Sequence, residues 1–205
     1  MCLYVNMKEN DPVDEQGSPL PKVSDKPIRC LKVARKMHVP GQTPDEPEFV
    51  YYMPPIRDYY GFMYEVGKTA EMKGSPGKEP EPIHAVHTPC MAAIYMDMQF
   101  EVNMGLHTYR PESQGARFLY DALLEQITRR CSAEQVERGW LGETKWDEAV
   151  ILECEIPAGV PYYEGITEES RRIDTRGYAS EKLKVLRELT PEEVEKLPAP
   201  PAYVS

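Results

Sequence analysis

Proline is the feature that most restricts how this chain can fold. The 205 residues include 20 prolines, most of them in four stretches, residues 12–27, 40–55, 76–89 and 198–201. Proline has no backbone N–H to donate and fixes φ at about −65°, so it interrupts helices and is kept out of sheet interiors. These stretches therefore predict loops, turns or extended linkers, and the regular structure must lie between them.

The segments between the proline-rich stretches show the alternation of apolar and polar residues that is typical of strands. The expected strands are residues 28–37, 62–68, 91–102, 105–109 and 149–156, with a last one around 183–186.

Helical patterns are fewer. Apolar residues at helical spacing predict one main helix over about residues 112–130. A capping box predicts a second, short helix at 133–138, and Thr190 followed by Pro191 predicts a third.

These patterns together predict an α+β fold, with a mostly antiparallel sheet of about five strands packed with one main helix and long Pro-rich loops. Residues 1–27 are expected to form an irregular N-terminal arm, residues 28–197 a single α+β domain, and residues 198–205 a Pro-rich tail. Hydrophobic residues make up 41% of the chain, which is enough to bury a core of ordinary size.

The charge of the chain restricts its partners. Lys and Arg total 24 against 34 for Asp and Glu, which gives a net charge of −10. Such a chain repels phosphate backbones at long range, so nucleic acid is disfavoured as a partner. No apolar run approaches the roughly 20 residues that span a bilayer, and the N-terminus lacks the apolar stretch of a signal peptide. We therefore expect no membrane and a protein that stays inside the cell.

The cysteines indicate a reducing compartment. They are odd in number and widely scattered, at Cys2, Cys30, Cys90, Cys131 and Cys154. In a chain without an export signal, this pattern favours reduced thiols over disulfides.

The most metal-like spacing in the chain is formed by His84, His87 and Cys90. Imidazole and thiolate ligands suit zinc, and a structural zinc site would need a fourth ligand, for which His107 or Asp97 is a candidate. The segment is flanked by prolines and has no second Cys/His pair, so a plain loop is the favoured interpretation. No metal or other cofactor is expected.

Two further features point to binding or chemistry without deciding between alternatives. His107 ends a strand just before the main helix, where a histidine can act as a base or can simply be a structural residue. Three Tyr-Tyr doublets, at residues 51–52, 59–60 and 162–163, lie in loop-like segments. Tyrosines in loops suit contacts with a partner or ligand, and they also serve as lids over the edge of a core.

Several blocks of sequence together resemble a family of proteins from Bacteroides-type bacteria and their phages. The blocks are Met1-Cys2-Leu3-Tyr4, Cys30-Leu31-Lys32-Val33, Tyr64–Lys68, Gly105–Tyr109, Glu153–Tyr163 and Gly177–Lys184. They keep a consistent order through most of the chain. The resemblance implies a protein of a gut phage or mobile element, and it implies no activity.

The chain is also similar to the ADP-ribosyltransferase fold, in which a strand ending in Ile-Pro-x-Gly precedes a loop and a strand with a catalytic Glu. Residues 156–159 carry that similarity. It implies that Glu181 lies near the catalytic position, with His107 or Tyr109 lining the pocket. The candidate ligand-binding residues lie in or beside the blocks named above: Tyr64, Arg110, Tyr178 and Ser180.

Two functions follow from these features. The first is a non-catalytic accessory protein of a phage or mobile element, either a virion component or a host-interaction factor that binds a protein partner. It rests on the family resemblance, the Pro- and Tyr-rich loops and the scarcity of catalytic motifs. The alternative is a nucleotide-acting enzyme or nucleotide-binding protein with an ADP-ribosyltransferase-like fold. The oligomeric state stays open under both.

Overall fold

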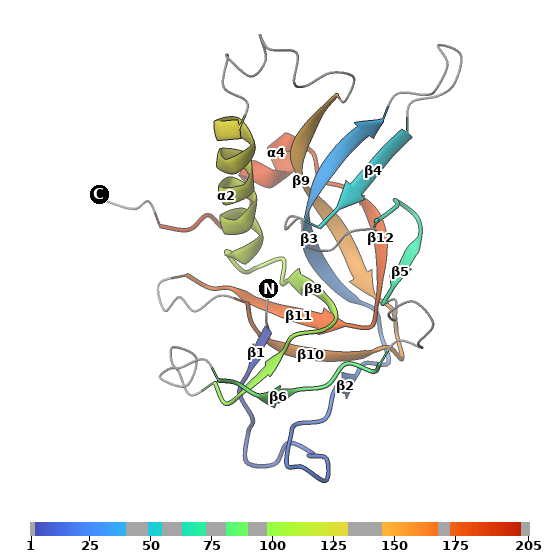
Figure 1. Cartoon of the computed structure of the whole chain (residues 1–205), viewed down its shortest axis with the longest axis vertical. Helices are drawn as coiled ribbons and strands as arrows, with labels where there is room; N and C mark the ends of the chain where they lie inside the picture. Colours follow the sequence, from blue (N-terminus) through green and yellow to red (C-terminus); the bar gives the residue numbers. More distant parts are fainter. Residues whose placement is uncertain are drawn as a thin grey trace.

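The computed structural model describes residues 3–39, 49–54, 63–72, 81–89, 98–130, 145–167 and 173–201. These residues form strands and two helices (Figure 1). The helices are α2 (Gly115–Arg130) and α4 (Pro191–Glu195). The strands are β1 (Leu3–Val5), β2 (Lys22–Val23), β3 (Ile28–Val39), β4 (Phe49–Met53), β5 (Thr69–Glu71), β6 (Val86–His87), β7 (Phe100–Val102), β8 (Leu106–Tyr109), β9 (Lys145–Ile156), β10 (Pro161–Ile166), β11 (Arg176–Ser180) and β12 (Lys182–Glu188).

The expectation of about five strands packed with one main helix was wrong. The described residues place 12 strands in a single, antiparallel sheet, with two short helices beside it. Several strands are only two or three residues long, which leaves no alternation for a sequence pattern to detect. Residues 64–67 also differ, because Tyr64 makes one isolated bridge and a turn at Gly67 (φ 82°) follows.

The sheet consists of two groups of strands. Its order is β5-β12-β9-β3-β8-β11-β10-β1-β7-β6, with β4 beside β3 and β2 beside β10. The upper group consists of β5, β12, β9, β3 and β4, and the lower group consists of β8, β11, β10, β2, β1, β7 and β6. In Figure 1 the strands of the upper group run steeply, while β8, β11 and β10 run across. The two groups meet where β3 pairs with β8, through a single register pair, Leu31 opposite Tyr109.

The upper group is built on the long pair β3 and β9, which stay paired from Ile28–Ile156 to His38–Lys145. Both faces of this pair are buried, as the apolar residues on both faces of residues 28–37 predict. Leu31 and Val33 pack with α2 in one cluster, while Cys30 and Ala34 belong to the cluster on the opposite face.

The two helices pack against the upper group, and they lie where the sequence predicts them. Helix α2 begins at Gly115, whose Cβ, if present, would lie 2.2 Å from the Tyr109 ring, so helix and strand touch at this glycine. Helix α4 has the expected capping box: the Thr190 hydroxyl accepts from the Glu193 N–H, and the Glu193 carboxylate accepts from the Thr190 N–H. The expected helix at 133–138 lies outside the described residues. No helix in the described part of the chain is both long and apolar enough to cross a membrane.

The lower group curls tightly at a pair of facing glycines. Gly165 on β10 pairs with Gly177 on β11. A Cβ on Gly177 would lie 2.1 Å from the Thr108 carbonyl oxygen, and one on Gly165 would lie 2.0 Å from the Tyr4 carbonyl oxygen. Only glycine permits such close backbone approach, so these two positions fix the curvature of the lower group.

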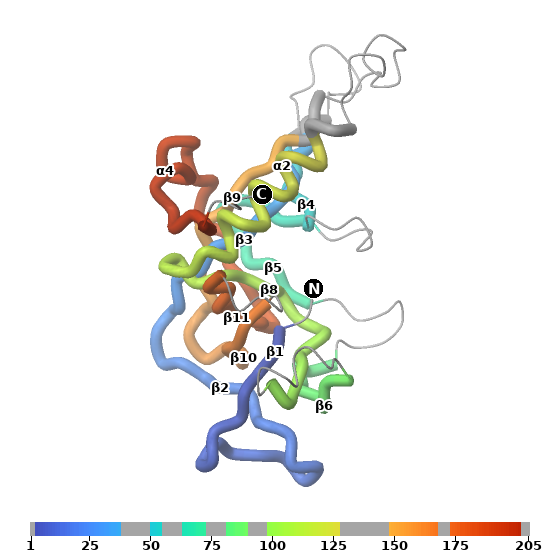
Figure 2. Tube along the Cα trace, turned by 90° about the vertical axis from the view of Figure 1, so that its left-hand side faces the viewer, coloured from blue at the N-terminus to red at the C-terminus, as the bar shows by residue number. Residues whose placement is uncertain are grey.

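The first 27 residues contribute two strands to the lower group. Strand β1 pairs with β7 and β10, and its residues Leu3 and Val5 are buried in the lower core. Strand β2 pairs with β10 at Pro161 and Tyr162. The chain between β1 and β2 forms the lower end of the molecule, away from α2 and α4, in both Figure 1 and Figure 2.

Candidate functional site

The structure brings the four candidate ligand-binding residues to one side of the lower group. Ser180 pairs with Leu106, and Tyr178 pairs with Thr108. Facing residues of an antiparallel pair lie on the same side of the sheet, as do alternate residues along a strand. Thr108, Tyr178 and Ser180 therefore share one face, which we call the inner face because Tyr178 packs there in the same core cluster as Tyr64 and Cys30.

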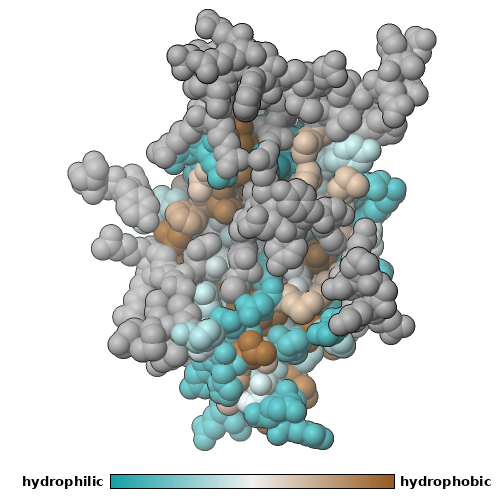
Figure 3. Space-filling model, in the orientation of Figure 1, coloured by the Kyte–Doolittle hydropathy of each residue, from teal (hydrophilic) through white to brown (hydrophobic). Residues whose placement is uncertain are grey.

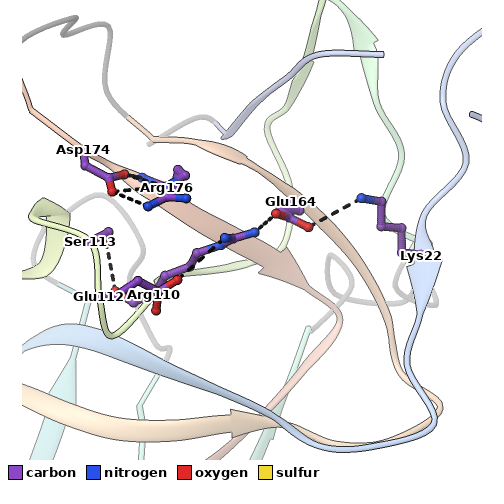
Figure 4. A network of polar contacts seen from close by, with 7 residues as sticks. All are labelled: Lys22, Arg110, Glu112, Ser113, Glu164, Asp174 and Arg176. Carbon is purple, nitrogen blue, oxygen red and sulfur yellow. Dashed lines mark hydrogen bonds and ion pairs between the residues drawn. The ribbon is translucent and has the colours of Figure 1, made fainter. Parts of the chain in front are cut away.

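The exposed end of the inner face is a network of charged side chains (Figure 4). Arg110 is paired with Glu164, and its Nη1 lies 3.6 Å from a Glu112 carboxylate oxygen. Lys22 lies 3.5 Å from Glu164. Arg176 pairs with Asp174 at 2.6 Å and holds the pKa of that carboxyl below its usual range by hydrogen bonding. Three cations face three carboxylates, so the network is neutral.

Aromatic rings line the inner face beside this network. The Arg110 guanidinium carbon lies 5.5 Å from the centre of the Tyr178 ring. The Tyr162 ring meets Tyr178 edge to face, with 5.9 Å between ring centres. Burial raises the pKa of the Tyr178 hydroxyl, which opposes its ionisation. The arrangement is a cation–π stack supported by a second ring, and its members partly face solvent.

The buried end of the inner face holds an unusual residue, Lys32. Its side chain is on the same face of β3 as Cys30, two residues earlier, and only 7% of Lys32 is exposed. The Nζ atom donates a hydrogen bond of 2.7 Å to the His107 carbonyl oxygen on β8. It also lies 5.6 Å from the centre of the Tyr64 ring. Lys32 thus connects the two groups of strands next to their single register pair.

Two thiols and a hydroxyl complete this buried cluster. Cys30 and Cys154 face each other across β3 and β9, and both are free and fully buried. The Cys154 thiol donates weakly to the Leu152 carbonyl at 3.7 Å. The Thr108 hydroxyl is fully buried beside the Cys30 thiol, and within the part of the chain that the structure describes it has no hydrogen-bond partner of standard geometry.

Burial shifts every titratable group of the cluster toward its neutral form. The pKa of Lys32 falls from 10.5 to about 8, because burial disfavours the ammonium. The pKa of Cys30 rises to about 12 for the same reason, and that of Cys154 is also raised by burial. The thiols are therefore protonated and unreactive at neutral pH, while Lys32 stays mostly charged.

The three candidate catalytic residues each make structural contacts. His107 and Tyr109 are alternate residues of β8, so both are buried on the face opposite the inner face. The His107 Nε2 lies 3.1 Å from the Val102 carbonyl oxygen, and Tyr109 packs in the cluster under α2. The Glu181 carboxylate accepts a hydrogen bond of 3.2 Å from the Ile83 N–H. His107 and Tyr109 thus point away from the face that carries Arg110 and Tyr178.

The histidines of the metal hypothesis also have local contacts. The His84 Nδ1 lies 3.2 Å from the Pro82 carbonyl oxygen, and the His87 ring stacks on Phe100 at 4.5 Å. Cys90 lies outside the described residues. Among the described residues, no three His, Cys, Asp or Glu side chains are placed to hold a metal ion.

Sequence reasoning missed Lys32, Thr108 and Glu164. A signal for Lys32 was available, since it lies at the centre of a strand between the apolar pairs Cys30-Leu31 and Val33-Ala34. Glu164 carried no such signal, because its role depends on pairing between β10 and β11 across the glycine pair.

Comparisons with protein-family models, curated proteins and solved structures give no match to this chain. The resemblances to the Bacteroides and phage family and to the ADP-ribosyltransferase fold therefore stay hypotheses.

We expect Lys32→Met to stabilise the protein by roughly 1–2 kcal/mol at pH 7 and low salt. The lowered pKa corresponds to about 3 kcal/mol of unfavourable burial, and loss of the hydrogen bond to His107 offsets about 1 kcal/mol of the gain. Because the folded pKa is below the unfolded one, the penalty is complete below pH 8 and fades toward pH 10.5. Urea unfolding at several pH values measures it, with the exposed Lys182→Met as control. A Lys32→Met variant less stable than wild type would contradict the account.

We expect the stability of the protein to fall as the pH drops from 6.5 toward 4. Burial lowers the pKa of His107 to about 4, so only the unfolded state takes up this proton in that range. The full loss for this group is roughly 3 kcal/mol. Urea unfolding of wild type and His107→Gln between pH 7 and 5 measures it. Equal pH dependence in the two proteins would show that His107 is not the group responsible.

Proposed function

We propose that this protein is a non-catalytic accessory protein of a phage or mobile element that acts by binding a partner protein through its N-terminal arm. The observation that carries the proposal is a set of aliphatic side chains in the arm that are exposed to solvent. This set, which we call the arm patch, consists of Val13, Leu20 and Val23.

The arm patch is well exposed. Val13 is 46% exposed, Leu20 43% and Val23 62%. Val13 and Leu20 lie on paired backbone segments of the arm, because Val13 bridges to Pro19 and the Leu20 N–H donates to the Pro12 carbonyl. Apolar side chains appear among hydrophilic ones at this lower end of the molecule in Figure 3. Exposed apolar area is unfavourable in water, and its cover by a partner is worth about 25 cal/mol per Å².

The arm that carries the patch is held in place by the body of the protein. The Tyr163 hydroxyl donates a buried hydrogen bond of 2.9 Å to the Pro19 carbonyl. The Gly159 N–H donates to the Ser24 carbonyl at 2.9 Å. A fixed arm loses little conformational entropy when a partner binds, so its apolar residues are organised for association.

Two other observations support a non-catalytic role. His107, Tyr109 and Glu181 each make structural contacts, as described above. The charges at the exposed end of the inner face are neutralised by one another. The resemblance to proteins of Bacteroides-type bacteria and their phages supports a place in the host cytoplasm or in a virion.

A photo-crosslinking amino acid at Val23 or Leu20 tests this function in cells that express the protein from its native genetic context. We expect both positions to crosslink to the same protein, and Val13→Asp to abolish the product. Glu65, exposed in the turn before β5, is the matched control position and should give no such product. Mass spectrometry of purified particles then separates a virion component from a host-cell factor. No product at Val23, or an equal one at Glu65, would contradict the proposal.

A second candidate function is nucleotide binding at the inner face. The observation that favours it is the guanidinium of Arg110 stacked on Tyr178 with Tyr162 against the ring edge. Nucleotide bases stack on aromatic and guanidinium planes. The neutral network would have to give up one of its carboxylate partners to a phosphate, which places this candidate second.

Thermal melting with NAD and with cyclic nucleotides tests the second candidate. We expect a melting temperature that rises with ligand concentration in wild type and in the exposed control Lys182→Gln, and not in Arg110→Gln. An unchanged melting temperature in wild type, or the same rise in Arg110→Gln, would remove this candidate.

A further inference from the structure

We propose that the buried end of the inner face binds a small monovalent anion, held by the Lys32 ammonium, the Thr108 hydroxyl and the Cys30 thiol. This site is separate from the arm patch and does not depend on the function proposed above.

The Lys32 ammonium has more hydrogen-bond donors than its described neighbours use. A lysine ammonium has three N–H donors and no acceptor. Among the described residues, the acceptor for Lys32 is the His107 carbonyl oxygen at 2.7 Å. The Tyr64 ring covers another side of the ammonium, but a ring face compensates a charge only weakly.

Thr108 lies next to this hydrogen bond, because it follows His107 on β8. Thr108 is 0% exposed, and among the described residues its hydroxyl has no hydrogen-bond partner of standard geometry, although the Cys30 thiol lies beside it. A buried hydroxyl without a partner costs about 1–3 kcal/mol, so such groups are rare and usually have a ligand or water to bond. Thr108 lies on the inner face, the same side to which Lys32 and Cys30 point.

The Lys32 ammonium also brings a positive charge into the core. Lys32 carries a positive charge into a core where the described neighbours are thiols, a hydroxyl and a ring, and buried charges in proteins are normally paired. Glu153 and Glu155, the nearest carboxylates along β9, alternate with Cys154 and so lie on the other face of the sheet.

These three features select the class of ligand. The ammonium can only donate, while the Thr108 hydroxyl and the Cys30 thiol can donate as well as accept. A water molecule could bond to the ammonium and the hydroxyl, but it would leave the buried charge without a counter-ion. A monovalent anion accepts from all three donors and neutralises the single buried charge, whereas a phosphate dianion would leave a negative charge in the core.

Thermal melting at constant ionic strength tests the proposal with bromide and formate as probes, each replacing gluconate stepwise. We expect the melting temperature of wild type to rise with at least one probe and that of Lys32→Met to stay constant. Thr108→Val, which keeps the shape of the side chain, should respond more weakly. The exposed Lys182→Met serves as control and should respond like wild type. A wild type without response, or a Lys32→Met variant with an equal response, would overturn the proposal.

A crystal grown in bromide locates the ion. The expected result is an anomalous difference peak within hydrogen-bond reach of the Lys32 Nζ and the Thr108 Oγ1. Peaks at surface sites alone would contradict the assignment, even if the melting temperature had risen.

Discussion

The burial of the Lys32 ammonium is the constraint around which the inner face is arranged. Lys32 lies on β3 where the two groups of strands meet, next to the single register pair between Leu31 and Tyr109. Its hydrogen bond to the His107 carbonyl is a second connection across that junction. The apolar cluster around Cys30 and Tyr178 supplies the hydrophobic stabilisation, whereas the ammonium opposes it. A charge kept in such a place at a net cost in stability indicates a role other than folding.

The inner face extends from this buried charge to the surface. Thr108 and Cys30 surround the buried end, Tyr178 and Tyr162 line the middle, and Arg110 begins the exposed network. The exposed network is neutral by itself, while the buried end carries an excess of donors. The two ends therefore differ in what they can bind, and the apolar residues of the arm form a third, separate surface. The proposed partner-binding surface and the proposed internal site thus share no residue.

Part of the fold could be predicted from the sequence because it depends on local patterns. Patterns among adjacent residues predict the two-sided burial of β3, the alternation in β9 and the cap at Thr190. The structure contains all three. Strands β2, β5 and β6 were missed because two or three residues carry no period. The site depends on pairing between distant residues. Arg110, Tyr178 and Ser180 come together through the register of β8 and β11, whereas that same register sends His107 to the other face and leaves Glu181 in the bend after β11.

The most direct test of the account is the titration of Lys32 itself. Carbon-13 NMR of ε-labelled lysine, with Lys32→Met to assign the signal, follows the ammonium in a halide-free buffer. Burial without a carboxylate partner predicts a midpoint at about pH 8. A midpoint at the ordinary value of 10.5 or above would mean that the charge is solvated or paired, and it would contradict the central claim.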